Sequence, residues 1–71
     1  MDTIIEGNKK VEKKGTTVFN GKRVKVIEYY INKSMTWIFA GVYYIPAKVS
    51  DKDLINVLED KIFEEELINF N

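Results

Sequence analysis

Residues 35–45 read Met-Thr-Trp-Ile-Phe-Ala-Gly-Val-Tyr-Tyr-Ile, and this stretch decides the fold. The side chains of a β-strand point alternately to its two faces, so the stretch divides into two apolar sets. One set is Met35, Trp37, Phe39 and Tyr43, and the other is Ile38, Ala40, Val42 and Tyr44. We predict a strand that is apolar on both faces, of which a single helix covers only the slimmer one, away from Trp37.

Local turn signals predict that this strand belongs to an antiparallel meander. Asn20-Gly21 supplies the positive φ angles of a type I′ turn and predicts a hairpin between residues 16–19 and 22–31. Pro46 has no amide hydrogen to donate to a neighbouring strand, so the aromatic strand is expected to end there.

The N-terminal part of the chain carries weaker signals. Gly7-Asn8 could close a tight turn, which leaves residues 1–14 as either a weak hairpin or a frayed segment. We therefore predict a meander of three to five strands within a single small domain, residues 1–71.

A C-terminal helix is predicted after Ser50. This serine is a favoured N-cap residue, and Asp51 and Asp53 suit the positive end of the helix dipole. At about 100° per residue, one stripe of the helix is apolar and consists of Leu54, Ile55, Val57, Leu58 and Ile62. The stripe then drifts, so we predict a helix through about Glu65, with a short strand at residues 67–70 as the alternative. The predicted fold class is α+β, a small antiparallel β-meander with one C-terminal helix packed on one face.

The composition excludes several classes of site. The chain has 71 residues with no cysteine and no histidine, which removes disulfides and the usual zinc and haem ligand sets. No cofactor or metal is predicted. The N-terminus lacks the basic start and apolar run of a signal peptide, and no apolar run approaches the roughly 20 residues of a membrane-spanning helix. We therefore expect a cytoplasmic protein without a membrane segment.

No arrangement of residues indicates catalysis. Ser34 and Ser50 have no histidine to accept a proton, and turn or cap chemistry explains both of them. The carboxylates of Glu64, Glu65 and Glu66 point in different directions around a helix, which favours a solvated surface over a metal or acid-base cluster. We predict that the protein is not an enzyme and has no catalytic residue.

The formal net charge is zero, but the charges are divided unevenly along the chain. Residues 1–48 carry nine cations and four anions, a net charge of +5, whereas residues 49–71 carry two cations and seven anions, a net charge of −5. This pattern indicates either a basic binding face or a basic sheet and an acidic helix that attract each other. We favour the second interpretation.

Two binding hypotheses remain, and the first is protein binding through the aromatic face. The partner would be a larger protein, which the chain could inhibit, or a second copy of the chain. The predicted contact residues are Trp37, Phe39 and Tyr43, with Tyr29 or Tyr30 from the neighbouring strand. The structural alternative is that the N-terminal strands or the C-terminal tail fold over these aromatics in a small half-barrel.

The second hypothesis is single-stranded nucleic-acid binding. Bases would stack on aromatic side chains while cations meet phosphates. The stacking residues would be Tyr29, Tyr30, Trp37 or Tyr43, and the cations would be Lys22, Arg23, Lys25 and Lys33. The zero net charge and the single arginine weigh against it, so protein binding is the preferred prediction.

The ten lysines, nine isoleucines and six asparagines also suggest AT-rich coding, which is compatible with a low-GC bacterium or one of its phages.

Overall fold

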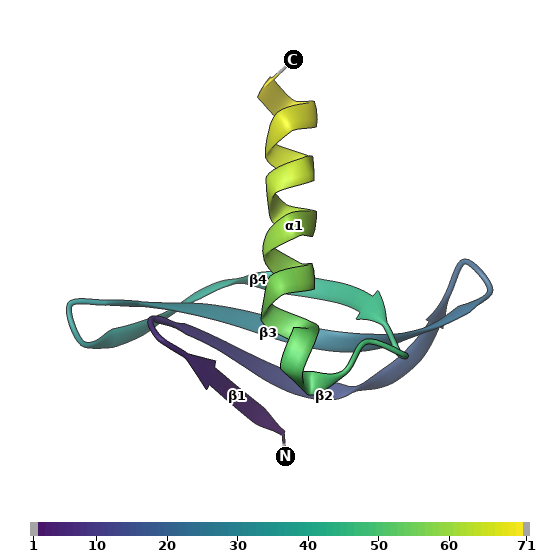
Figure 1. Ribbon diagram of the computed structural model, residues 1–71, viewed down its shortest axis with the longest axis horizontal. Helices are drawn as coiled ribbons and strands as arrows, with labels where there is room; N and C mark the ends of the chain where they lie inside the picture. Colours follow the sequence, from purple (N-terminus) through teal and green to yellow (C-terminus); the bar gives the residue numbers. More distant parts are fainter. Residues whose placement is uncertain (1, 71) are drawn as a thin grey trace.

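The computed structural model describes the backbone of residues 2–70 and the side chains of residues 2–67. Its elements are β1 (Thr3–Glu6), β2 (Lys9–Phe19), β3 (Lys22–Lys33), β4 (Thr36–Pro46) and α1 (Asp51–Phe70) (Figure 1). The four strands pair in the order β1-β2-β3-β4, and every pair is antiparallel. The predicted α+β meander with one C-terminal helix is therefore confirmed. Met1 and Asn71, the ends of the predicted domain, lie outside the described residues.

Two-residue turns join the long strands. Asn20 and Gly21 have φ angles of 52° and 76°, so the predicted hairpin with two positive φ values is confirmed. Ser34 and Met35 repeat this geometry between β3 and β4, with φ angles of 51° and 65°. Met35 therefore lies in a turn, and its predicted place on the aromatic strand is wrong.

The N-terminal segment forms a hairpin rather than a frayed end. Gly7 has a φ of 62°, and β1 pairs with β2 so that Ile4 lies opposite Val11. Both side chains pack in or against the core, which explains how a segment with few apolar residues is held on the sheet. Strand β2 is consequently longer than the predicted strand at residues 16–19, because it begins at Lys9.

The helix begins where the cap signals placed it but ends later than predicted. The Asp53 amide donates to the Ser50 carbonyl at 3.0 Å, and the Ser50 hydroxyl donates to the Asp53 carboxylate at 3.2 Å. The helix then continues to Phe70, so both the end near Glu65 and the short terminal strand are wrong. Residues 51–70 contain neither glycine nor proline, so no local breaker stops the helix when its apolar stripe drifts.

One face of the sheet carries the core. The helix crosses the strands on that face and continues past the edge formed by β4 (Figure 1). The buried cluster combines strand and helix side chains, namely Val11, Ile27, Tyr29, Ile45, Leu54, Ile55 and Leu58. The buried residues of α1 are those that lie over the sheet. Packing against the sheet, rather than helix propensity, therefore positions the N-terminal half of the helix.

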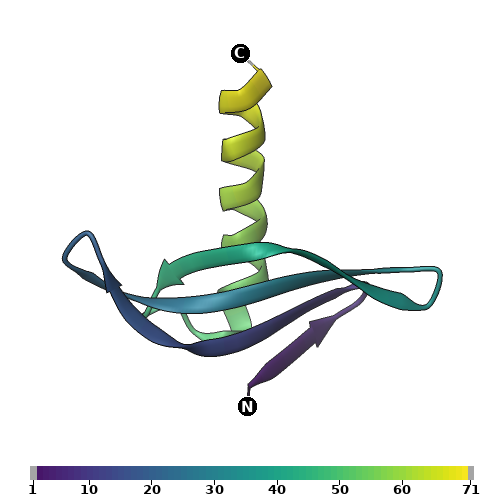
Figure 2. The same cartoon turned by 180° about the vertical axis from the view of Figure 1, so that it is seen from behind.

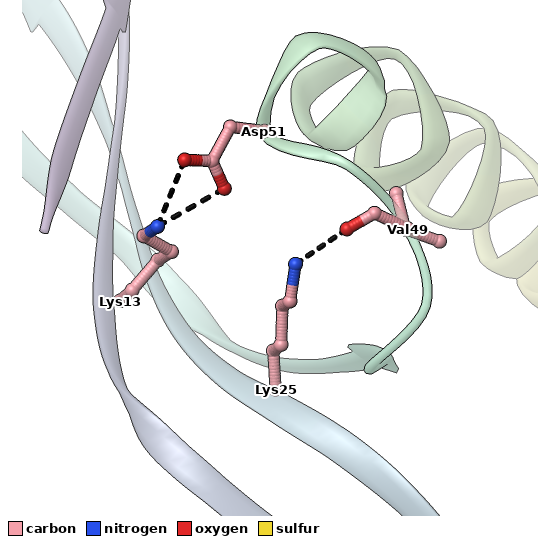
Figure 3. Close-up of polar contacts among 4 residues, drawn as sticks. All are labelled: Lys13, Lys25, Val49 and Asp51. Carbon is pink, nitrogen blue, oxygen red and sulfur yellow. Dashed lines mark hydrogen bonds and ion pairs between the residues drawn. The ribbon is translucent and has the colours of Figure 1, made fainter. Parts of the chain in front are cut away.

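Polar contacts attach the start of the helix to the basic strands. The Lys13 ammonium lies 2.9 and 3.0 Å from the two carboxylate oxygens of Asp51, and the Lys25 ammonium donates to the Val49 carbonyl (Figure 3). Farther along the helix, Lys9 contacts Glu59 at 2.6 Å. These contacts agree with the interpretation that the basic sheet and the acidic helix attract each other.

Candidate functional site

A β-bulge in β4 decides which side chains reach each face of the sheet. Tyr29 lies opposite Gly41 and Tyr30 lies opposite Phe39, so Ala40 is the extra residue of the strand. Gly41 has a φ of 139°, and a Cβ built there would lie 3.1 Å from the ring of Tyr43. Glycine therefore suits this position both in conformation and in space, and the bulge reverses the alternation of side chains beyond it.

The reversal brings Tyr43 to the helix side. Residues opposite each other in an antiparallel pair share a face, and Tyr43 lies opposite the buried core residue Ile27. Its ring meets that of Tyr29 edge to face, with centroids 6.3 Å apart. Tyr29 itself is only 4% exposed. The predicted place of Tyr43 beside Trp37 is therefore wrong, and Tyr29 belongs to the core.

We call the face opposite α1 the open face. The register places aromatic and aliphatic side chains there, among them Phe19, Tyr30, Trp37, Phe39, Val42 and Tyr44. Trp37 and Phe39 are where the sequence predicted them, whereas Val42 and Tyr44 were expected beneath the helix, which is wrong. The isolated glycine at position 41 is the signal that could have revealed this, because glycine within a strand often marks a bulge.

The aromatic side chains of the open face contact one another and remain accessible. Phe39 meets Tyr30 edge to face, with ring centroids 5.6 Å apart, and Phe19 stacks on Tyr44 at 5.3 Å. Phe39 is 53% exposed, Phe19 is 52% exposed and Tyr44 is 42% exposed. These pairs hold the rings in defined positions while leaving much of their surface to solvent.

Charged groups border the aromatics on the β2 side. The Tyr30 hydroxyl donates to the Glu28 carboxylate at 2.8 Å, and this hydrogen bond raises the pKa of the phenol to about 12. The Lys14 ammonium lies 3.5 Å from the same carboxylate. The Lys10 ammonium lies 4.5 Å from the ring centroid of Tyr30 and 5.1 Å from that of Trp37, a cation–π geometry. The aromatic surface therefore has a rim in which both signs of charge are paired.

No described segment covers the open face. Strand β1 extends the sheet beside β2, and α1 lies on the opposite side of the sheet (Figure 2). The half-barrel alternative, in which the N-terminal strands or the tail fold over the aromatics, is therefore wrong for the part of the chain that the structure describes.

The four cations proposed for nucleic-acid contact are not gathered around the aromatics. Lys22 lies opposite Phe19 on the open face. The register places Lys25 and Lys33 on the helix side. Arg23 lies on the same side, because it is two residues before Lys25 in β3. Lys25 is also engaged by the Val49 carbonyl. The sheet thus separates Arg23, Lys25 and Lys33 from Trp37.

Other site types were also sought in the described residues. The described part of the chain, residues 2–70 with side chains up to residue 67, contains no cluster of three acidic, histidine or cysteine side chains placed to hold a metal ion. Within the same range, no helix has the length and apolar character needed to cross a membrane. Comparisons with protein-family models, curated proteins and solved structures gave no match.

Proposed function

We propose that this protein is a small, non-catalytic binding module that docks on a larger folded protein through its open face. The observation that carries this proposal is the set of accessible aromatic and aliphatic side chains on the sheet face opposite the helix. Trp37 and Phe39 lie in this set, and its other members come from three strands. We expect the protein to act in the cytoplasm and to inhibit or recruit its partner by occupying that partner's surface.

The chemistry of the open face suits a protein surface. Binding energy at protein interfaces concentrates in a few aromatic side chains surrounded by a polar rim that excludes water. Trp37, Phe39 and Tyr44 supply such side chains, and the Lys14–Glu28 pair lies at the rim. The rings are already held by contacts with each other, so little side-chain freedom is lost on binding.

Single-stranded nucleic acid is the less favoured partner. A base stacking on Tyr30 or Trp37 would have to displace the Lys10 ammonium from their rings. Glu28 adds a negative charge beside them, and the proposed phosphate-binding lysines Lys25 and Lys33 lie on the other face. The charge and geometry therefore support a protein partner.

The test compares wild-type protein with Trp37→Lys in capture of partners from host lysate, followed by binding measurements with the purified partner. Thr36→Lys is the matched control, because it adds the same charge at the neighbouring residue on the opposite face of β4. We expect Trp37→Lys to weaken binding by about tenfold or more, and Thr36→Lys to leave it unchanged. Far-ultraviolet circular dichroism checks that both variants fold.

Salt dependence separates the two classes of partner. A protein interface built on apolar contacts should persist at high salt, whereas binding to phosphates weakens steeply as salt rises. Retention of the partner by a folded Trp37→Lys variant would overturn the proposal. Capture of a nuclease-sensitive, salt-sensitive ligand would instead assign the face to nucleic acid.

A further inference from the structure

Three cations meet at the end of the sheet where β4 leads into the helix. Lys22 and Arg23 begin β3 directly after the β2–β3 turn, and Lys48 lies two residues beyond the end of β4. All three line one pocket, and Pro46 and Ala47 complete its wall. We call these five residues the cationic pocket. It contains the only arginine of the chain.

Backbone hydrogen bonds hold the cationic pocket in place. The Ala47 amide donates to the Arg23 carbonyl at 3.1 Å, and the Val49 amide donates to the Pro46 carbonyl at 3.0 Å. The second bond closes a β-turn with Lys48 at its third position. The backbone that carries Arg23 and Lys48 is therefore already ordered, which lowers the cost of binding a ligand.

The cations of the pocket have no acidic partner among the described side chains. Three other lysines are each paired with a carboxylate at 3.5 Å or less, namely Lys9, Lys13 and Lys14. In the same part of the chain, no ion pair involves Lys22, Arg23 or Lys48, and all three are exposed. The nearby Lys25 is held by the Val49 carbonyl (Figure 3). Like charges that share one pocket repel each other, so the pocket favours an anionic ligand.

The cationic pocket is continuous with the open face. Lys22 lies on that face, opposite Phe19. Lys22 and Pro46 also line a larger groove, which contains Phe19 and Tyr44. A protein surface that covers the stacked rings of Phe19 and Tyr44 therefore borders the cationic pocket.

We propose that the cationic pocket binds adjacent carboxylates on the protein that docks on the open face. This inference rests on the proposed function and adds the charge of the partner's surface, which is an apolar patch flanked by acidic side chains. The planar guanidinium of Arg23 can donate two parallel hydrogen bonds to one carboxylate. The ammonium groups of Lys22 and Lys48 supply the charge for a second carboxylate.

A nucleic-acid backbone suits these cations less well than an acidic protein surface. Single-strand binders place cations along a groove that follows the row of phosphates. Here Lys25 is held by a backbone carbonyl, and Lys33 lies at the opposite end of β3. The unpaired charge is thus local and matches a short acidic stretch. Binding two carboxylates also gives a much shallower salt dependence than binding a row of phosphates.

The test is an NMR titration with a tetraglutamate peptide blocked at both ends, at constant ionic strength. We expect saturable shifts of the backbone amides of residues 22, 23, 47 and 48, and none with tetraglutamine. Arg23→Gln should raise the dissociation constant about fivefold or more, because it removes the bidentate donor and keeps the backbone hydrogen bonds. Lys33→Gln is the matched control, since it removes one exposed cation at the other end of β3, and we expect no change.

Three results of this titration would overturn the proposal. They are the absence of saturable shifts, equal binding of tetraglutamine, and equal dissociation constants for Arg23→Gln and Lys33→Gln. Inorganic phosphate at the same ionic strength is the second probe. Tighter binding of phosphate than of tetraglutamate would assign the pocket to phosphate groups and would also overturn the proposal.

Trp37→Lys distinguishes this inference from the proposed function. The variant leaves the cationic pocket intact, so it should bind tetraglutamate as the wild-type protein does while it loses the captured partner. If no partner is captured, the proposed function fails, whereas the titration still reports on the pocket. With a purified partner, Arg23→Glu should slow association about fivefold or more. An unchanged association rate and affinity would show that the partner's carboxylates do not use this pocket.

Discussion

The two faces of the sheet have similar apolar sequences but different environments. Ile45 and Tyr44 are neighbours in β4, yet Ile45 is 1% exposed beneath the helix and Tyr44 is 42% exposed on the open face. The helix can lie on only one face, so the other keeps its aromatic side chains in contact with solvent. The comparison shows that an apolar strand pattern identifies buried or bindable surface without distinguishing the two.

The largest expected effect is the difference between truncations on the two faces of β4. Ile45→Ala removes a buried side chain and should lower the free energy of unfolding by about 2–5 kcal/mol. Val42→Ala, on the open face of the same strand, should change it by less than about 1 kcal/mol. Urea denaturation followed by circular dichroism measures both values. Equal losses for the two variants would contradict the assignment of the faces.

A smaller effect is expected at the bulge that separates the faces. Gly41→Ala places a side chain at a φ of 139° and 3.1 Å from the Tyr43 ring, which should cost about 1–3 kcal/mol of stability. Gly15→Ala is the control, because Gly15 has a similar φ of 131° but open space around it. Urea denaturation measures the free energy of unfolding of both variants, and the difference between them gives the cost of the steric contact with Tyr43. A larger cost at Gly15 than at Gly41 would refute the close approach of Tyr43.

The smallest expected effect concerns the ion pair that attaches the helix to its face. The hydrogen bond from Lys13 holds the pKa of Asp51 below its ordinary value of 3.8. Because the folded-state pKa is the lower one, this contribution is present above pH 3.8 and is lost as the pH falls through the folded value. Asp51→Asn should therefore flatten the loss of stability below about pH 3.8 in acid-dependent denaturation.

The control for the acid experiment is Asp60→Asn. It removes an exposed carboxylate from the same helix, away from Lys13, and should retain the slope of the wild-type protein. An unchanged slope in Asp51→Asn would show that this ion pair does not help to hold the helix on the sheet.

Elements with local chemical causes could be predicted from the sequence. Asn20-Gly21 requires little beyond its own dihedral preferences to form a turn, and Pro46 ends β4 because it lacks an amide hydrogen. The start of the helix follows from Ser50 and Asp51 for a similarly local reason. The predicted end of the helix was wrong because it was placed where the apolar stripe ends. The stripe shows which residues contact the sheet, not where the helix stops.

The candidate site was predicted only in part. Trp37 and Phe39 lie before the bulge, so simple alternation placed them correctly on the open face. Tyr43 and Tyr44 lie after it, and one extra residue exchanged their faces. Phe19 was not predicted as part of the site. It lies there because its ring stacks on Tyr44, and the two rings come from β2 and β4, which are not neighbours in the sheet.

The sequence by itself determined the meander, the turns and the presence of an amphipathic helix, because each depends on interactions between residues close together in the chain. The tertiary structure alone decided which side chains beyond the bulge lie beneath the helix, that the helix extends beyond β4, and that Tyr44 rather than Tyr43 remains accessible on the open face. These features depend on strand register and on packing between distant segments. Alternation with a period of two residues predicts the face of a side chain only up to a bulge, because the extra residue there exchanges the two faces.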